Sequence, residues 1–399
     1  MQSRISSGPL ASTPPLESGP PASDHLLRGF RQSELSRRAR PPASRYAVDF
    51  AVRVALMSAG YVLVLAFARS PFVSPGGIAW FGGITLFALA SVSMVGSWFH
   101  DAVHGNVRGG RWRSEAVLRA GSAAIGLGPR WWFHKHVRLH HRYVGNPAFD
   151  PDIQFSWFGR VTAEQPWHAL HRAQHLYMWL LLPFSTLNML KPSELWTTRQ
   201  AVVRRVVGPR GRGWPWFLLA DKYLPHAVVW IPVFLVLPTR RALLTYLLFH
   251  LISGTFVSLI TQVQHNTDLA EYGPSVDGTE SLSAQLSRST DVGGGRGFWY
   301  WLSGGTTYHC VHHLAPTLTF PELPAATERL VALLAGTEMA VRTHPSMWAA
   351  VKSHGRLIRA LSVPESGTGQ SGTGQNCAGK NSAGQNPAPQ DTAGHGGKL

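Results

Sequence analysis

Cysteine and acidic residues are both scarce in this 399-residue chain. Cys310 and Cys377 are its two cysteines, which excludes a disulfide framework and any zinc or iron–sulfur site built from cysteine. Charged residues make up only 15% of the chain, whereas the apolar set AVILMFWYC makes up 44%. The 37 Lys and Arg outnumber the 21 Asp and Glu, giving a net charge of +16. A basic chain with so few charged residues is not typical of a soluble enzyme.

The two ends of the chain differ in composition from its middle. Residues 1–45 combine a Pro- and Ser-rich stretch with several arginines, and we expect them to form a disordered arm. Residues 364–399 contain near-repeats of TGQ and AGQN, and we expect a disordered low-complexity tail. The sequence therefore predicts one ordered domain over residues 46–363.

Long apolar runs dominate this central part. Residues 76–99 and 242–264 contain no charge, and each run exceeds the roughly 20 residues that a helix needs to cross a bilayer. Residues 54–68 and 224–238 are two shorter candidates. The predicted fold class is therefore an all-α integral membrane protein with four transmembrane helices.

Positive charge predicts the orientation of these helices. Basic residues are concentrated in the N-terminal arm, in residues 108–135 and in residues 199–222, so we expect these parts and both termini on the cytoplasmic side. The run from Leu176 to Leu190 is shorter than a crossing requires and contains Pro183. We therefore expect it to lie as a helix in the membrane interface rather than as a fifth span.

Histidine carries the chemical signal of the sequence. HDAVH, HVRLHH and HCVHH space their histidines by three or four residues, so the imidazoles of one cluster can converge on one centre if the segment is helical. A single HxxxH pair is expected about once by chance at this histidine content, but two clusters of three are not. The predicted topology places all three clusters at cytoplasmic span ends. Their members are His100, His104, His136, His140, His141, His309, His312 and His313.

Eight imidazoles exceed the ligand number of one ordinary metal site, which predicts two metal ions. Neutral imidazole suits Zn, Cu, Fe and Ni, so a structural zinc pair is one alternative. Two iron ions explain more, because a di-iron site can reduce O2 and supply an oxidant for the C–H bonds of a lipid chain. We therefore expect a cytoplasmic helical cap that holds a di-iron site. Asp150 and Asp152 follow the second cluster and are candidates to accept hydrogen bonds from ligand imidazoles.

These motifs resemble the three histidine boxes of the membrane-bound fatty acid desaturases. HDAVH is similar to the first box, WFHKHVRLHHRYVGNPAFDPD to the second and FWYWLSGGTTYHCVHHLAPTL to the third. The resemblance implies that the eight box histidines ligate two irons, and that His265 in ITQVQHN is a ninth ligand. His309 and Thr306-Thr307 differ from the pattern of acyl-lipid relatives that act near the carboxyl end, which leaves the position of the double bond open.

The resemblance implies an O2-dependent desaturase that introduces a double bond into a fatty acyl lipid. Such a reaction requires two external electrons, and the chain contains neither the HPGG of a fused b-type haem domain nor a Cys-rich ferredoxin segment. We expect a separate donor such as ferredoxin or a b-type cytochrome, membrane lipids as further partners, and no nucleic acid. The alternatives are a membrane di-iron hydroxylase or ketolase acting on a lipid or carotenoid, and a histidine-rich metal transporter. Transport sites normally lie near mid-membrane, whereas these clusters follow span ends.

Overall fold

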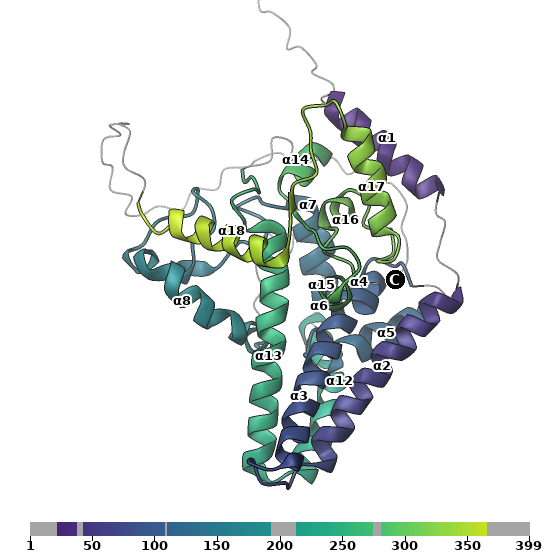
Figure 1. The fold of residues 1–399 in the computed structure, drawn as a ribbon, viewed down its shortest axis with the longest axis vertical. Helices are drawn as coiled ribbons and strands as arrows, with labels where there is room; N and C mark the ends of the chain where they lie inside the picture. Colours follow the sequence, from purple (N-terminus) through teal and green to yellow (C-terminus); the bar gives the residue numbers. More distant parts are fainter. Residues whose placement is uncertain (1–21, 38–42, 108–109, 193–212, 274–280, 365–399) are drawn as a thin grey trace, which may run out of the picture.

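The structure, a computed structural model, is a bundle of long helices with a layer of shorter helices at one end (Figure 1). It describes residues 22–37, 43–107, 110–192, 213–273 and 281–364. The outermost parts of the predicted arm and tail lie outside these ranges, and the proposed domain boundaries stay a prediction.

Four helices are long and apolar enough to cross a membrane, which confirms the predicted fold class. The first span, Tyr46–Ala66, lies in α2, and the second, Pro75–Val103, begins with α3. α12 and α13 form the third and fourth spans. The helix bounds are α2 (Ala43–Ala66), α3 (Pro75–Met94), α12 (Trp214–Val236) and α13 (Thr239–His265).

The third span begins at Trp214, ten residues before the predicted start at Leu224. The predicted run leaves out the charged pair Asp221 and Lys222, but both side chains are buried within the protein. Lys222 Nζ donates to the carbonyl of Lys191 at 2.8 Å, and Asp221 accepts from the backbone N–H of Arg130 at 3.1 Å. Charges with such internal partners can be accommodated in an apolar helix.

Glycine allows α2 and α3 to pack closely. A Cβ on Gly60 would lie 2.5 Å from the backbone nitrogen of Phe87, and one on Gly83 would lie 2.7 Å from Leu63 Cβ. Ser74 begins α3 by accepting a hydrogen bond from Gly77 N at 3.0 Å, and Pro75 occupies the first helical turn. The chain thus reverses sharply between the first two spans.

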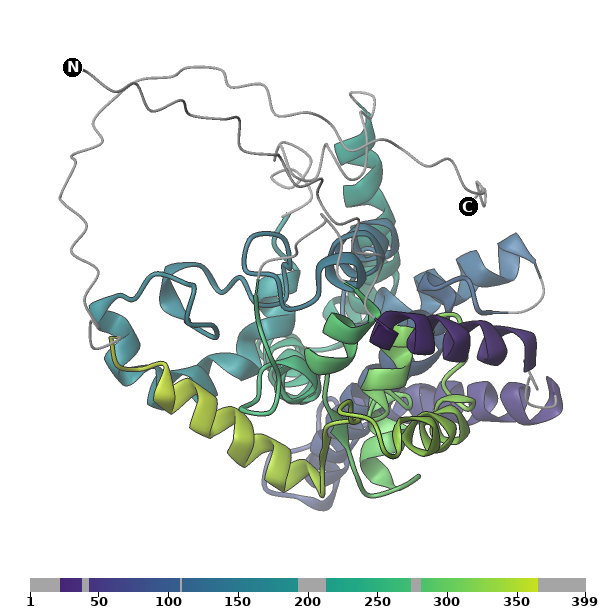
Figure 2. The same ribbon diagram turned by 90° about the horizontal axis from the view of Figure 1, so that it is seen from above.

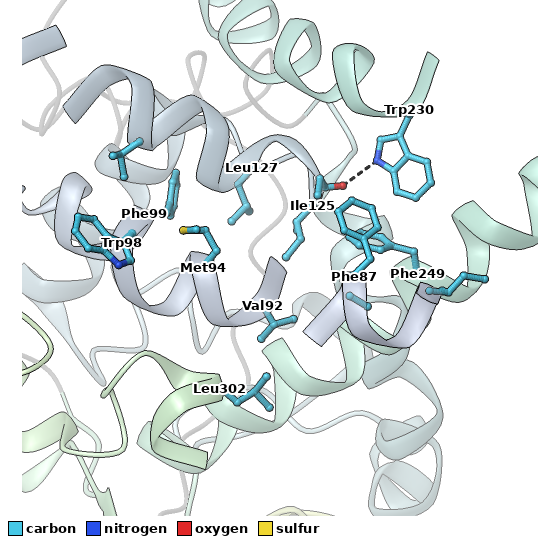
Figure 3. Close-up of a cluster of buried hydrophobic side chains, with 14 of the residues drawn as sticks. Phe87, Val92, Met94, Trp98, Phe99, Ile125, Leu127, Trp230, Phe249 and Leu302 are labelled. Atoms are coloured by element: carbon cyan, nitrogen blue, oxygen red, sulfur yellow. Dashed lines mark hydrogen bonds between the residues drawn. The ribbon is translucent and has the colours of Figure 1, made fainter. Parts of the chain in front are cut away.

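The main hydrophobic core joins α3, α12 and α13 to the shorter helices (Figure 3). Phe87 and Phe249 pack with ring centroids 4.7 Å apart, and Trp230 approaches Phe249 at 5.0 Å. The indole N–H of Trp230 donates to the carbonyl of Ala124 at 2.9 Å, which satisfies the one polar atom of that ring. This contact fixes the chain after α5 (Arg111–Ala123) against the third span.

The cap at one end of the bundle consists of short elements. Two of them are π-helices, at Val95–Phe99 and His134–His140, and one is a parallel pair of two-residue strands. The other cap elements are α4 (His100–Val103), α5 (Arg111–Ala123), α6 (Pro129–Phe133), α7 (His141–Tyr143), a 3-10 turn (Ser156–Phe158), α14 (Leu282–Ser287), β1 (Asp291–Val292), α15 (Phe298–Ser303), α16 (His309–Leu314), α17 (Leu323–Leu334) and β2 (Thr343–His344).

Residues 22–37, assigned above to a disordered arm, form the helix α1 (Ala22–Arg37) in the structure. Leu27 and Phe30 are buried in a core shared with α14, α16 and α17. Glu34 accepts a hydrogen bond from Arg329 Nε at 2.7 Å. Leu27 and Phe30 lie about one turn apart on a helix that is polar on average, so composition alone did not predict this apolar stripe.

The run from Leu176 to Leu190 is not among the candidate spans, which agrees with the prediction that it is not a fifth crossing. Its predicted place in the membrane interface stays a prediction. The run is broken at Pro183, and its second half packs against α13, where Thr186 Oγ1 donates to the carbonyl of His250 at 2.8 Å. α18 lies beside its first half (Figure 2). The elements are a 3-10 helix (Ala169–Ala173), α8 (Gln174–Leu181), a 3-10 turn (Leu182–Phe184), α9 (Ser185–Met189) and α18 (Met347–Ala360).

Candidate metal centre

The structure brings all nine predicted histidines together at the capped end of the bundle, in two adjoining groups made of histidine alone. A third group, His136, His140 and Asp152, joins one member of each to a carboxylate. Within each group the candidate ligand atoms all lie within 4.8 Å of one another. The rings of His141 and His313, one from each group, have centroids 4.4 Å apart. The five-histidine group comprises His100, His104, His136, His141 and His312, and the four-histidine group comprises His140, His265, His309 and His313.

The π-helix His134–His140 divides the second cluster between the two groups. His136 and His141 are five residues apart, and their Nε2 atoms lie 3.2 Å from each other. A π-helix repeats its contacts at five residues, so it aligns this pair where an α-helix would align His136 with His140. His140 belongs to the four-histidine group instead. The expectation that each cluster converges on one centre is therefore not met here.

The third cluster is divided in the same way. His309 and His313 are one α-helical turn apart on α16, and their Nε2 atoms lie 3.1 Å from each other. His312 projects in another direction, and its Nε2 lies 3.0 Å from that of His141. Each group thus draws on several distant segments of the chain, and α16 contributes to both.

The geometry of the four-histidine group fits a cation better than a set of hydrogen bonds. The Nε2 atoms of His265, His309 and His313 form a triangle with sides of 2.7, 3.1 and 3.2 Å. Each nitrogen either carries a proton or does not, so at least two of the three must be alike and repel one another. Neighbouring ligands at about 2.1 Å from one ion are about 3.0 to 3.4 Å apart. The donor set therefore fits a bound metal.

The geometry of the five-histidine group also fits a cation better than a set of hydrogen bonds. His100 and His141 both place Nε2 near Nε2 of His136, at 2.9 and 3.2 Å. His104 Nε2 is buried and has no hydrogen-bond partner among the described residues. A buried imidazole nitrogen without a partner is unfavourable in a purely structural role, whereas a metal ion would satisfy it.

Burial keeps most of these imidazoles in the form that binds metal. Desolvation, together with neighbouring imidazoles, lowers the pKa of six cluster histidines well below 6.5, so each is neutral at physiological pH. The six are His104, His136, His141, His309, His312 and His313.

Asp150 orients His140 within the centre. Burial alone would lower the pKa of His140, but Asp150 and Asp152 outweigh it and raise that pKa. Asp150 Oδ1 lies 3.0 Å from His140 Nδ1, and its Oδ2 accepts from the backbone N–H of Gly145 at 2.8 Å. Asp150 therefore caps the local turn and also contacts a candidate ligand. Asp152 forms an ion pair with Lys135, and its Oδ2 lies 3.4 Å from His140 Nδ1.

A backbone carbonyl orients His265. The Nδ1 of His265 lies 3.0 Å from the carbonyl oxygen of Arg288, which leaves Nε2 directed at His309. Sequence reasoning missed this partner, because any residue can supply a carbonyl. It also missed Trp132, whose ring stacks on His136 at a centroid distance of 5.6 Å. Trp132 is the first residue of the stretch quoted for the second box, but its residue type alone does not indicate that it stacks on an imidazole.

Other histidines and acids near the motifs belong to neither group. His171 Nε2 lies 2.9 Å from the carbonyl oxygen of Trp157, and His175 Nδ1 lies 3.3 Å from Ser362 Oγ. Asp101 accepts from Tyr46 at 2.8 Å rather than from an imidazole. These side chains hold the fold around the centre.

Four apolar helices, capped at one end by two groups of imidazoles, define a membrane protein with a histidine-rich candidate metal centre. The sequence model described as fatty acid desaturase matches residues 75–345, which is more than half of the chain. The chain belongs to the fatty acid desaturase family. At family level it is therefore an oxidoreductase, and the family implies a lipid acyl substrate and O2.

Individual relatives are distant. The chain is 22% identical over 280 residues to sn-1 linoleoyl-lipid 6-desaturase of Arthrospira platensis, covering 67% of this chain and 74% of that protein. It is 27% identical to acyl-lipid (9-3)-desaturase of Physcomitrium patens, covering 55% of this chain and 42% of that protein. It is also 27% identical to dihydrorhizobitoxine desaturase of Bradyrhizobium elkanii, covering 55% and 59%. The match thus spans less than half the length of the Physcomitrium patens relative.

Proposed function

We propose that this protein is an O2-dependent acyl desaturase that introduces a double bond into a lipid acyl chain at a di-iron site. The observation that carries the proposal is the pair of adjoining imidazole groups, of five and four members, at the end of four membrane helices. An arrangement at span ends suits chemistry on a lipid, whereas transport sites normally lie near mid-membrane. The proposal therefore favours catalysis over transport.

The nine histidines would hold two iron ions, one in each group. Bound there, the two irons would supply O2 activation. With two external electrons and two protons, one O2 and two hydrogens from adjacent carbons would give a double bond and two waters. Asp150 and the carbonyl of Arg288 accept hydrogen bonds from the Nδ1–H groups of His140 and His265, which leaves both Nε2 atoms free to coordinate. Burial of the cluster excludes bulk water from the reacting carbons.

A separate protein, such as ferredoxin or a b-type cytochrome, would deliver the electrons from the cytoplasmic side. Arg138 and Arg142 are exposed on the same short helices that carry His136, His140 and His141. An acidic donor docking on these arginines would lie within a few residues of both groups. The two exposed arginines therefore support the proposal that the candidate centre lies on the cytoplasmic side of the membrane, where soluble electron donors are found.

The position of the double bond and the substrate are open to experiment. The relatives carry names that differ in the position of the bond, and one is named for dihydrorhizobitoxine. The test is fatty acid methyl ester profiling of cells that express the wild-type chain, His312→Ala or His25→Ala. His25 is exposed on α1 and far from the cluster in the chain, so it provides a matched control.

New unsaturated acyl chains in the wild type and His25→Ala, but not in His312→Ala, support the proposal. Double-bond location by mass spectrometry then gives the site of attack. Hydroxylated or oxo products in place of alkenes would contradict it and favour the hydroxylase or ketolase. Profiles that are identical in all strains and in cells without the gene would contradict acyl chemistry altogether.

A further inference from the structure

A groove between α8 and α18 is lined mainly by cations. α18 runs beside α8 on one side of the bundle (Figures 1 and 2). The groove has a volume of about 390 Å³ and is lined by His175, Lys352, Gly355, Arg356 and Arg359. A Cβ on Gly355 would already contact Trp179 at 3.4 Å, so this glycine lets the two helices lie close together.

The protein neutralises only part of this positive charge. Arg356 forms an ion pair with Asp268. Lys352 and Arg359 are exposed and have no ion-pair partner among the described residues. Lys352 Nζ lies 5.2 Å from the ring of Trp348, which is itself exposed. Unpaired Lys and Arg side chains around one groove favour an anionic ligand, and phosphate oxygens match the donors of both residue types.

Contacts with α13 give the depth of this region in the membrane. Ser258 donates to the carbonyl of Leu182, and Thr186 donates to that of His250. These α13 residues lie 7 and 15 positions before its last residue, His265, or about 10 and 22 Å along the helix axis. The segment that follows α8 therefore lies well below the end of the span, and α8 descends from the capped end towards hydrocarbon.

Apolar side chains are exposed along α8 as it runs from the capped end towards the hydrocarbon. Leu176 and Leu180 are 64% and 71% exposed, and Leu181 is also exposed, as is Phe184 in the turn that follows α8. Cations near the membrane surface followed by exposed leucines at greater depth match the order of charge and apolar surface in a phospholipid. A soluble anion would account for the cations but not for the leucines.

We propose that this groove binds the phosphate group of an anionic phospholipid, whose acyl chains lie along the exposed leucines of α8. This site is distinct from the histidine cluster and does not depend on the proposed reaction. The bound lipid would hold α18 in position at the membrane surface. α18 in turn contacts the end of the fourth span, where His354 Nδ1 lies 2.6 Å from the carbonyl oxygen of Asn266.

The test is native mass spectrometry of the full-length protein in detergent, titrated with phosphatidylglycerol or phosphatidylcholine. We expect the wild type to retain phosphatidylglycerol preferentially. The double variant Lys352→Gln/Arg359→Gln should lose about fivefold in phosphatidylglycerol affinity for each cation removed, with no change for phosphatidylcholine. The control Arg31→Gln/Arg37→Gln removes the same charge from exposed positions on α1 and should behave like the wild type.

Unchanged phosphatidylglycerol affinity in the groove variant would overturn the proposal, and so would an equal loss in the control. A groove variant that keeps its lipid preference but no longer accepts electrons from an acidic protein would also overturn it, and would assign the groove to protein docking. Both substituted side chains are exposed and outside the ion pairs of the fold, so we expect matching circular dichroism spectra for all variants.

Discussion

The Nε2 atoms of His265 and His309 lie 2.7 Å apart, although 44 residues separate them in the chain. His265 is the last residue of α13, and His309 is the first residue of α16. Their approach ties the fourth span to the cap. It also places a residue outside the three histidine motifs at the centre of the four-histidine group.

Replacing His265 by Ala should remove one ligand from the four-histidine group and leave the other group intact. Iron content, measured by inductively coupled plasma mass spectrometry, should fall by about half, because three imidazoles hold an ion less tightly than four. Desaturation should be lost. His25→Ala should keep the iron and the activity of the wild type. Full iron occupancy in His265→Ala would show that this residue is not a ligand.

Asp150→Asn should weaken the interaction that orients the His140 ring, while it leaves all nine candidate ligands in place. The amide keeps one oxygen for the turn but no longer supplies a carboxylate to His140 Nδ1. Losing such a partner typically costs 10- to 100-fold in metal affinity or activity. Iron retention during dialysis against a chelator measures the effect. Asp152→Asn is the matched control and should lose less, because its oxygen is farther away, at 3.4 Å. Equal losses would contradict a special role for Asp150.

The metal-free protein should become less stable as the pH falls below about 6.5. Burial lowers the pKa of His104, His136 and four other cluster histidines, so the unfolded chain binds protons there that the folded chain does not. His140 has a raised pKa and acts in the opposite direction, but it is one residue against six. Melting temperatures of chelator-treated protein between about pH 7.5 and 5.5 test this. A melting temperature that rises with acidification would refute it.

Gly60→Ala should destabilise the packing of α2 on α3. The added Cβ would lie 2.5 Å from backbone nitrogen of Phe87, and backbone cannot move aside as a flexible side chain can. We expect a loss of about 1 to 3 kcal/mol in the free energy of unfolding, seen as a lower melting temperature in detergent. Gly82→Ala is the control, because nothing lies within 4 Å of its Cβ position. Equal melting temperatures for the two variants would contradict the close approach.

The sequence predicted the spans well where apolar runs were continuous. Residues 76–99 and 242–264 lie within two of the observed spans, because no internal partner is needed to bury uncharged residues. The predicted third span left out the start of α12, which contains Asp221 and Lys222, because their partners Arg130 and Lys191 come from distant parts of the chain. α1 was missed because its burial depends on α14 and α16, which composition does not reveal.

The identities of the candidate ligands were predictable, but their arrangement was not. Spacing and family resemblance singled out nine histidines, and the structure gathers all nine. How they divide between two groups depends on the backbone geometry of His134–His140, and α-helical spacing gives the wrong pairing there. The carbonyl of Arg288 carries no side-chain signal, so only three-dimensional packing reveals its contact with His265.

Neighbouring positions in the chain serve opposite halves of the centre at two places, His140–His141 and His312–His313. A trans peptide bond holds consecutive Cα atoms about 3.8 Å apart, so the covalent backbone limits how far the two histidine groups can separate. Thermal motion of the surrounding helices can change the orientation of the two histidine groups, but it changes the distance between them little. A deletion within either dipeptide would therefore disturb both halves at once, whereas a change at His100 or His265 would reach only one.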